Sequence, residues 1–306
     1  MELINPFAGV AMDLGNTLQM NFVVDMNKLE GTGHYAVITR TYANGDVKVG
    51  DPIPQSEWTL YSSKNNYYQF SYGNIAAKEM TDVLYATIYD SEGNAISVDW
   101  EDSTRSYVMR SINNLLKTPY ANLTAKKQKQ VTMLVDVLNY GAAAQKNFHY
   151  NEADLANALL SEEMMGYASE EATSESILER DSAYCAGTTL NLESQIELRI
   201  VFKESALNDV AYAVVTHTKH SGGSVETRVE AKDFGPYGST NLYVPVATLS
   251  GADGDQVVTC TLYDADDNVV TTVVESMSSY LARAKNGELA QMLLRLTKSA
   301  YAYFHA

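Results

Sequence analysis

The chain has 306 residues, with 38 acidic against 22 basic side chains and a formal net charge of -16. That length has room for two domains of ordinary size, each with its own core. So acidic a surface repels nucleic acid and anionic membranes, and without a run of about 18 apolar residues we expect no segment to insert into a membrane.

The sequence contains an internal repeat. Residues 35–41, Tyr-Ala-Val-Ile-Thr-Arg-Thr, return as residues 212–218, Tyr-Ala-Val-Val-Thr-His-Thr, and residues 67–97 align without a gap with residues 241–271. The order of the matches never changes, which is typical of a tandem duplication. We therefore expect a first unit over 1–150, an acidic connector over 151–184 and a second unit over 185–306.

Short strands are predicted in both units, in the same order. Apolar residues alternate with polar ones over 18–24 and over the matching residues 196–202, which indicates a half-buried strand. Four further pairs are predicted at 35–42 and 212–219, 68–72 and 242–246, 84–88 and 258–262, and 95–100 and 269–274. Strands of this length and spacing favour an immunoglobulin-like β-sandwich in each unit.

Two helices are predicted after each sandwich. Residues 103–116 and 276–285 share the spacing Ser-Tyr-x-x-Arg, and a longer helix with an apolar stripe follows in each unit, ending at Phe148 and Phe304. We expect this longer helix to pack against the shorter helix and the edge of its own sandwich. The predicted fold class is therefore mainly β with α: two tandem immunoglobulin-like β-sandwich units, each followed by a helical hairpin.

The connector is acidic and rich in Ser, Thr and Ala, which is typical of a solvated linker. We expect a helical turn around residues 170–178. Its first part is expected to dock on the first unit through apolar side chains, namely Leu155, Ala158, Leu159, Met164 and Met165.

The sequence shows no motif for catalysis. The five histidines lack metal-ligand spacing, and a nucleophile elbow, a phosphate loop and a dinucleotide fingerprint are missing. We therefore expect no enzymatic activity, no catalytic residue and no cofactor. Calcium stays open as an alternative, because carboxylates at 251–255 and 264–268 could supply oxygen ligands, although acidic hairpin turns often hold no ion. Cys185 and Cys260 either form a disulfide or remain two buried free thiols.

Tyrosine is the compositional outlier, with 21 residues against 7 Phe and 2 Trp. A tyrosine combines a rigid apolar ring with a polar tip and is favoured where a protein surface meets another protein or a sugar. Tyr42, Trp58, Tyr61 and Tyr67 are the hardest aromatic residues to assign to a core. They form our candidate ligand-binding patch.

One stretch of the first unit resembles a known family. Residues 134–145, Leu-Val-Asp-Val-Leu-Asn-Tyr-Gly-Ala-Ala-Ala-Gln, lead to Phe148, Tyr150 and Asp154-Leu155-Ala156-Asn157. Together with the Ser-Tyr-x-x-Arg helix, this stretch resembles repeat domains of large secreted or wall-attached surface proteins of gut Firmicutes. The second unit keeps Ser-Tyr-x-x-Arg, Phe304 and His305 but lacks Asn-Tyr-Gly. The resemblance implies an extracellular accessory domain and transfers no catalytic residue.

These observations favour a non-enzymatic extracellular binding or adhesion module of a bacterial surface protein, which binds a host protein, with immunoglobulin as one candidate. The alternatives are a glycan-binding accessory module of a polysaccharide-degrading enzyme and a passive spacer. The first residues lack the basic start and apolar run of a secretion signal. We expect a fragment of a larger exported protein, extracellular or attached to the cell wall, with a cytosolic protein as the competing interpretation.

Overall fold

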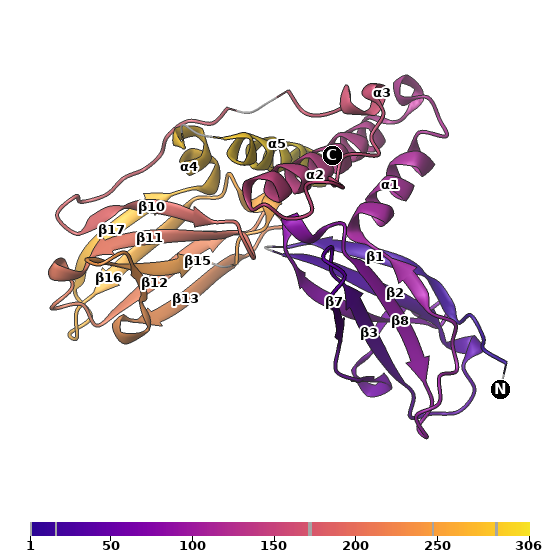
Figure 1. Ribbon diagram of the computed structural model, residues 1–306. Helices are drawn as coiled ribbons and strands as arrows, with labels where there is room; N and C mark the ends of the chain where they lie inside the picture. Colours follow the sequence, from indigo (N-terminus) through magenta and orange to yellow (C-terminus); the bar gives the residue numbers. More distant parts are fainter. Residues whose placement is uncertain (1, 16, 171–172, 247, 285–286) are drawn as a thin grey trace.

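The computed structural model describes residues 2–306 except 16, 171–172, 247 and 285–286. The chain is mainly β, with four antiparallel sheets and a few helices. In Figure 1 the sheets form two β regions that diverge from a layer of helices between them. None of the described helices has the length and hydropathy needed to cross a bilayer.

The first half contains two sheets. The strands of one sheet lie in the order β1 (Phe7–Leu14), β2 (Leu18–Asp25), β7 (Tyr67–Ile75) and β6 (Thr59–Ser62). The strands of the other lie in the order β4 (Val47–Val49), β3 (Tyr35–Thr41), β8 (Val83–Tyr89) and β9 (Trp100–Asp102), and β5 (Ile53–Pro54) also pairs with β3.

The second half repeats this order. One sheet runs β10 (Cys185–Asn191), β11 (Glu197–Lys203), β15 (Asn241–Val246) and β14 (Gly235–Tyr237). The other runs β13 (Ser224–Glu230), β12 (Tyr212–Thr218), β16 (Val258–Tyr263) and β17 (Val269–Glu275). Every matched strand therefore has the same neighbours in both halves.

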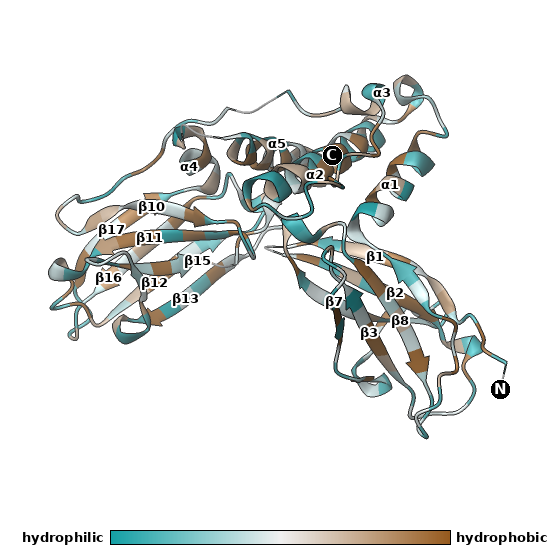
Figure 2. Cartoon of the chain, viewed as in Figure 1, coloured by the Kyte–Doolittle hydropathy of each residue, from teal (hydrophilic) through white to brown (hydrophobic). Residues whose placement is uncertain are grey.

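Alternating burial explains why these segments are strands. Along β8 the buried residues are Leu84, Ala86 and Ile88, while the residues between them are partly exposed. Figure 2 shows such brown apolar stretches along β2, β3 and β8. The buried faces of both sheets join one core, in which Phe22 of β2 stacks on Phe70 of β7 with ring centroids 5.6 Å apart. Burying such a side chain contributes about 1.5 to 3 kcal/mol.

The observed strands differ from the predicted ones in several places. The prediction of a strand over 95–100 is wrong for most of that segment, because β9 begins only at Trp100 and Ala95 makes a single bridge to Tyr89. The edge strands β1 and β10 were not predicted. Both lie at a sheet edge, half-exposed along most of their length, so their sequences lack a strong alternation.

The predicted helices are present, and their packing was predicted only in part. They are α1 (Thr104–Leu115), α2 (Ala125–Asn147), α4 (Met277–Arg283) and α5 (Glu288–Phe304), with the short α3 (Glu162–Met165) in the connector. We expected α2 to lie on α1 and the edge of its sandwich. α2 does contact α1, as expected, but it also lies along α5 of the other half (Figure 1). Its residues 133–145 are all buried. A helix enclosed on all sides needs apolar or small residues on every face, which the run Gly-Ala-Ala-Ala supplies.

The connector follows the prediction only in part. Ala156 is fully buried, and Leu155 and Met164 are half-buried, but Ala158, Leu159 and Met165 are exposed. The prediction of a helical turn is wrong for residues 173–178, which are irregular, and residues 171–172 lie outside the described residues. Near its end, Glu179 pairs with Val274, so the connector joins the edge of the second half.

Candidate functional site

The structure does not gather the four predicted aromatic residues into one patch. Tyr42 follows β3 in one sheet, whereas Tyr61 and Tyr67 lie on neighbouring strands β6 and β7 of the other sheet. Tyr61 is 52% exposed, and Tyr42 and Tyr67 are half-buried. The guanidinium of Arg40 lies 4.4 Å from the centre of the Tyr42 ring.

The prediction of an exposed Trp58 is wrong. Its side chain is only 5% exposed, its ring lies 5.2 Å from that of Phe70, and its Nε1–H donates a hydrogen bond to the carbonyl of Ile53 at 3.1 Å. A short 3-10 helix, Gln55–Glu57, precedes the tryptophan, and the Trp58 backbone N–H donates to the carbonyl of Gln55. Trp58 is therefore a core residue whose single polar atom is satisfied.

Arg40 is the centre of a buried polar cluster in the first half. It contacts Asp82 at 2.5 Å and Glu79 at 2.8 Å, and the Tyr150 hydroxyl donates to Asp82 at 2.7 Å. Burial by itself would lower the pKa of Arg40, but hydrogen bonds with Glu79 and Asp82 outweigh it and raise the pKa. The cluster ties β3 to the turn before β8 and to the residues after α2.

The second half uses neutral or histidine partners at the same place. His217 stands where the first half has Arg40, and its Nε2 lies 2.6 Å from the Thr248 hydroxyl oxygen. Asp253 matches Glu79 and contacts Nδ1 of His220 at 2.8 Å. Both halves therefore link the strand to the turn by side-chain contacts, but the first half uses an arginine with two carboxylates and the second uses histidines. This is expected of a structural anchor.

The Ser-Tyr-x-x-Arg motif also has a structural role. The motif serines are Ser106 and Ser279. Their backbone N–H groups donate to the side chains of Ser103 and Ser276, which cap α1 and α4. Arg110 pairs with Asp102, which precedes the first cap, and Arg283 pairs with Glu275, which precedes the second. Both acids are fully buried at their side chains, so each arginine neutralises a buried charge next to a helix start.

The Asn-Tyr-Gly-Ala stretch holds the start of the connector. The Gln145 amide donates to the Thr81 hydroxyl at 3.2 Å and accepts from the backbone N–H of Ala156 at 2.6 Å. The Asn157 amide donates to the Asn139 side-chain oxygen at 2.9 Å. These bonds hold Ala156 and Asn157 of the connector against α2.

Gly141 lets α2 pack closely against Met80 of the turn before β8. In the second half the small residue is on the turn and the larger one is on the helix. A Cβ on Gly141 would overlap the Met80 sulfur and lie 3.0 Å from the Ala156 Cβ. At the matching places the second half has Thr297 on the helix and Gly254 on the turn, and a Cβ on Gly254 would overlap the Thr297 methyl group. The two halves therefore solve the same packing problem in opposite ways.

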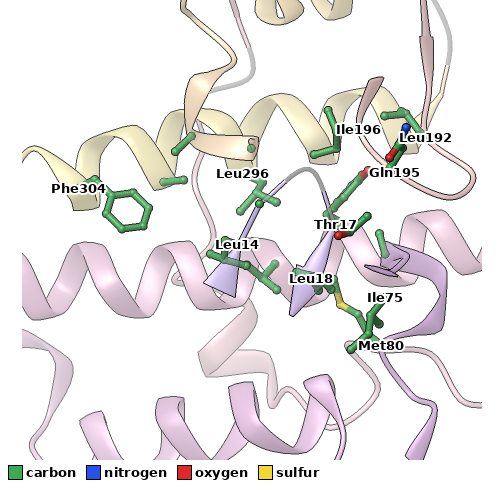
Figure 3. Close-up of a pocket in the computed structure, with 17 residues that line it drawn as sticks. Leu14, Thr17, Leu18, Ile75, Met80, Leu192, Gln195, Ile196, Leu296 and Phe304 are labelled. Atoms are coloured by element: carbon green, nitrogen blue, oxygen red, sulfur yellow. The ribbon is translucent and has the colours of Figure 1, made fainter. Parts of the chain in front are cut away.

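The two halves meet at an apolar junction (Figure 3). Leu14 and Leu18 of the β1–β2 hairpin face Leu296 of α5, with Ile196 from the second half beside them. The cavity between them has a volume of ≈ 30 Å³. That is room for about one water molecule, so the junction is a packed contact and not a site for an organic ligand.

Asp136 is a buried carboxyl at this helix layer. It lies on α2, is 1% exposed, and accepts a hydrogen bond from the backbone N–H of Ser169 at 3.2 Å. Burial raises the pKa of Asp136 to about 6, opposed by the Ser299 hydroxyl, the Ser169 N–H and the charge of Arg295. A pKa of about 6 means that Asp136 changes charge in mildly acidic solution.

The two cysteines are buried, and the carboxylates of the acidic loops make hydrogen bonds and ion pairs with their own chain. Cys185 and Cys260 are free and buried in the second core, and burial raises the pKa of both thiols. The Asp264 carboxylate accepts the backbone N–H groups of Asp266 and Asn268 at 2.9 and 2.8 Å, and Asp255 pairs with Lys298 at 2.8 Å. Among the described residues no group of three or more His, Cys, Asp and Glu could hold a metal ion.

Two larger hollows lie on the outer surface of the first half. One has a volume of ≈ 440 Å³ and is lined by Tyr42, Asn44, Asp46 and the residues 149–151 after α2. The other has a volume of ≈ 580 Å³ and is lined by Tyr35, Pro52 and Pro54 among others. Both volumes fall within the range of small-ligand sites. Of the predicted site residues, Tyr42 lines one of these two hollows. Tyr35 was missed because it begins a core strand.

No family model and no curated protein matches the chain. Among solved structures, the chain is similar to a tetra-tandem repeat in the extending region of a large adhesion protein, at 11% identity and a TM-score of 0.21, covering 88% of this chain and 48% of that one. It is also similar to Astrotactin-2, a vertebrate-specific, perforin-like membrane protein involved in neuronal development, at 11% identity and a TM-score of 0.22, covering 90% and 48%. The chain spans about half the length of both, and likenesses this distant carry no argument about fold or function.

Proposed function

We propose that the chain is a non-enzymatic binding or adhesion module of an extracellular bacterial surface protein. Its two halves would be immunoglobulin-like β-sandwich units whose outer loops bind a host protein. The observation that carries this proposal is the packing of α2 on α5, which joins side chains of both halves in one core. Two β regions held at a fixed separation lose little entropy when both contact one partner, and this favours binding.

The pattern of change between the halves supports binding rather than catalysis. Strand order, helix caps and the Asp102–Arg110 pair all have counterparts in the second half. The outward residues do not correspond: the exposed β4 has Val47 and Val49, where the matching positions of β13 carry Ser224 and Glu226. A duplicated scaffold that keeps its anchors and changes its outer face is typical of recognition modules.

Affinity capture tests the proposal. The full chain is immobilised and exposed to mucosal secretions, and retained proteins are identified by mass spectrometry, with heat-unfolded chain as the control. We expect a secreted host protein to be retained by the folded chain only. Turnover of any substrate by the purified chain, or no retained protein from any host fluid, would overturn it.

A specific observation also favours a second candidate, glycan binding. The hollow beside Tyr42 combines two tyrosine rings, those of Tyr42 and Tyr150, with the side chains of Asn44, Asp46 and Asn151. An aromatic face with amide and carboxylate groups at its rim suits the apolar face and the hydroxyls of a sugar. Binding to a glycan array that Tyr42→Ala abolishes and Tyr237→Ala leaves intact would select this function, since Tyr237 is an exposed tyrosine of the second half.

A further inference from the structure

Each half has a pair of stacked tyrosines at the same position. Tyr35 of β3 and Tyr89 of β8 have ring centroids 5.2 Å apart, and Tyr212 of β12 and Tyr263 of β16 have centroids 5.0 Å apart. In both sheets the strand of the first tyrosine lies between two others. The partner tyrosine therefore covers one face of its ring, and the opposite face points toward β5 in the first half and β13 in the second.

The second half covers that opposite face with a cation. The Arg228 guanidinium lies 3.5 Å from the centre of the Tyr212 ring and is paired with Glu230 at 2.8 Å. The Tyr212 hydroxyl donates to Asp267 at 2.7 Å. As a result, Tyr212 is only 7% exposed.

In the part of the first half that the structure describes, Tyr35 has no counterpart of these three partners. Tyr35 pairs with Pro54 where Tyr212 pairs with Glu230, and continuing this register places Pro52 where Arg228 stands. The gapless alignment places Gly93 where Asp267 stands. Tyr35 is half-buried, and among the described residues its hydroxyl has no hydrogen-bond partner. The hollow of ≈ 580 Å³ lies on this side of the ring, between Tyr35 and the two prolines.

The segments that border the hollow carry acidic side chains, although no carboxylate is among the residues that line it. The residues 29–35, 50–58 and 89–95 contain no Lys or Arg. The contacts of Tyr35 with Tyr89 and of Gly33 with Ser91 bring the first and third of these segments together, and residues 32–35 and 52–56 line the hollow. The acidic side chains of the three segments are Glu30, Asp51, Glu57, Asp90 and Glu92.

We infer that the open face of Tyr35 is a recognition site for a cationic side chain, an arginine presented by a basic extracellular protein. The inference rests on the proposed binding function and names the chemistry of its partner. The guanidinium would take the place over Tyr35 that Arg228 takes over Tyr212. The second half shows that this ring, in this sheet, accepts a guanidinium on that face. The acidic segments would attract the cation before contact.

The test is a titration of the full chain, with its tyrosine rings labelled for NMR, against a Gly-Ser peptide that contains one arginine. The control peptide carries citrulline, which has nearly the same shape without the charge. We expect the Tyr35 resonance to shift and saturate with the arginine peptide, and the citrulline peptide to bind at least about tenfold more weakly. Tyr35→Phe assigns the resonance.

Two variants separate the site from general attraction to an acidic protein. Pro52→Arg supplies the missing cation from the chain itself and should weaken peptide binding about tenfold while Tyr35 stays in place. Arg228→Ala uncovers Tyr212 and should give that ring a saturable shift of its own. Equal binding of both peptides, unchanged binding by Pro52→Arg, or a saturable shift with a proline-rich peptide alone would overturn the inference.

Repeating the affinity capture with Pro52→Arg distinguishes the failure of this inference from the failure of the proposed function. Loss of the captured host protein supports both. Equal capture by wild type and variant overturns the role of Tyr35 and leaves the binding function standing. A specific NMR shift without any captured protein supports the site and contradicts the proposed function.

Discussion

Replacing Asp136 with Asn should stabilise the protein at neutral pH. Burial raises the pKa of this carboxyl from its ordinary value of 3.8 to about 6. The folded state therefore favours the neutral form, and the stability that this group contributes is fully present below about pH 4 and lost as pH rises through 6. Across that window the loss amounts to about 3 kcal/mol, because each tenfold change in proton affinity is worth about 1.4 kcal/mol.

The Asp136→Asn side chain is neutral at every pH and can still accept from the Ser169 N–H. We expect its free energy of unfolding to exceed that of the wild type by about 2 kcal/mol at pH 7.5, after allowing about 1 kcal/mol for weaker hydrogen bonds. At pH 5 this advantage should shrink by about 1 kcal/mol.

Urea unfolding at both pH values, followed by circular dichroism, measures the two differences. Asp264→Asn is the matched control of opposite sign, because hydrogen bonds from Asn268 lower the pKa of the exposed Asp264. That control should lose stability at neutral pH and lose less in acid. An advantage of Asp136→Asn that is the same at pH 5 and 7.5, or no advantage at either, would refute the assigned pKa and its cause.

Three further predictions concern the junction, the helix starts and the thiols. Leu296→Ala should cost about 2 to 5 kcal/mol and broaden the distance distribution between spin labels placed at exposed Val49 and Val269, while Val257→Ala, at an exposed position, should do neither. Arg110→Ala should lower the free energy of unfolding by about 2 kcal/mol because it leaves Asp102 buried without its cation, and Asp102→Asn in the same chain should recover part of that loss in urea unfolding. Cys185 and Cys260 should resist alkylation by iodoacetamide in the native protein and react fully in urea, as followed by mass spectrometry, because burial raises the pKa of both thiols; rapid native labelling would contradict their positions.

The sequence predicted those features that local pattern controls. Alternation located most of the paired strands, and Ser-Tyr-x-x-Arg marked helices whose caps are Ser103 and Ser276. The packing of α2 on α5 was not predictable in the same way, because an apolar stripe shows that a helix face is covered but not which segment covers it. Trp58 was wrongly assigned to the surface because neither the 3-10 helix Gln55–Glu57 before it nor its contact with Phe70 can be recognised from residue type.

The candidate sites show the same division. Tyr42 was identified from the high tyrosine content of the chain and from its place outside the predicted core, and it does line a hollow. Tyr35 was assigned only to a core strand. That one face of its ring is open can be inferred only by comparing Pro52 with Arg228 across the repeat. That comparison needs the register of β3 with β5 and of β12 with β13, which depends on hydrogen bonds between strands and not on residue type.

The first half pairs a small helix residue, Gly141, with a large turn residue, Met80, and the second half pairs Thr297 with Gly254 in the opposite arrangement. This difference limits recombination between the two halves of the gene. A crossover between the two gene segments that fell between turn and helix would set Met80 against Thr297, or Gly254 against Gly141. The first product would be too crowded to close and the second would contain a void, each costing about 1 to 3 kcal/mol or more. Unequal recombination would therefore be selected against, and the two copies can no longer be shuffled, lost or multiplied as interchangeable parts.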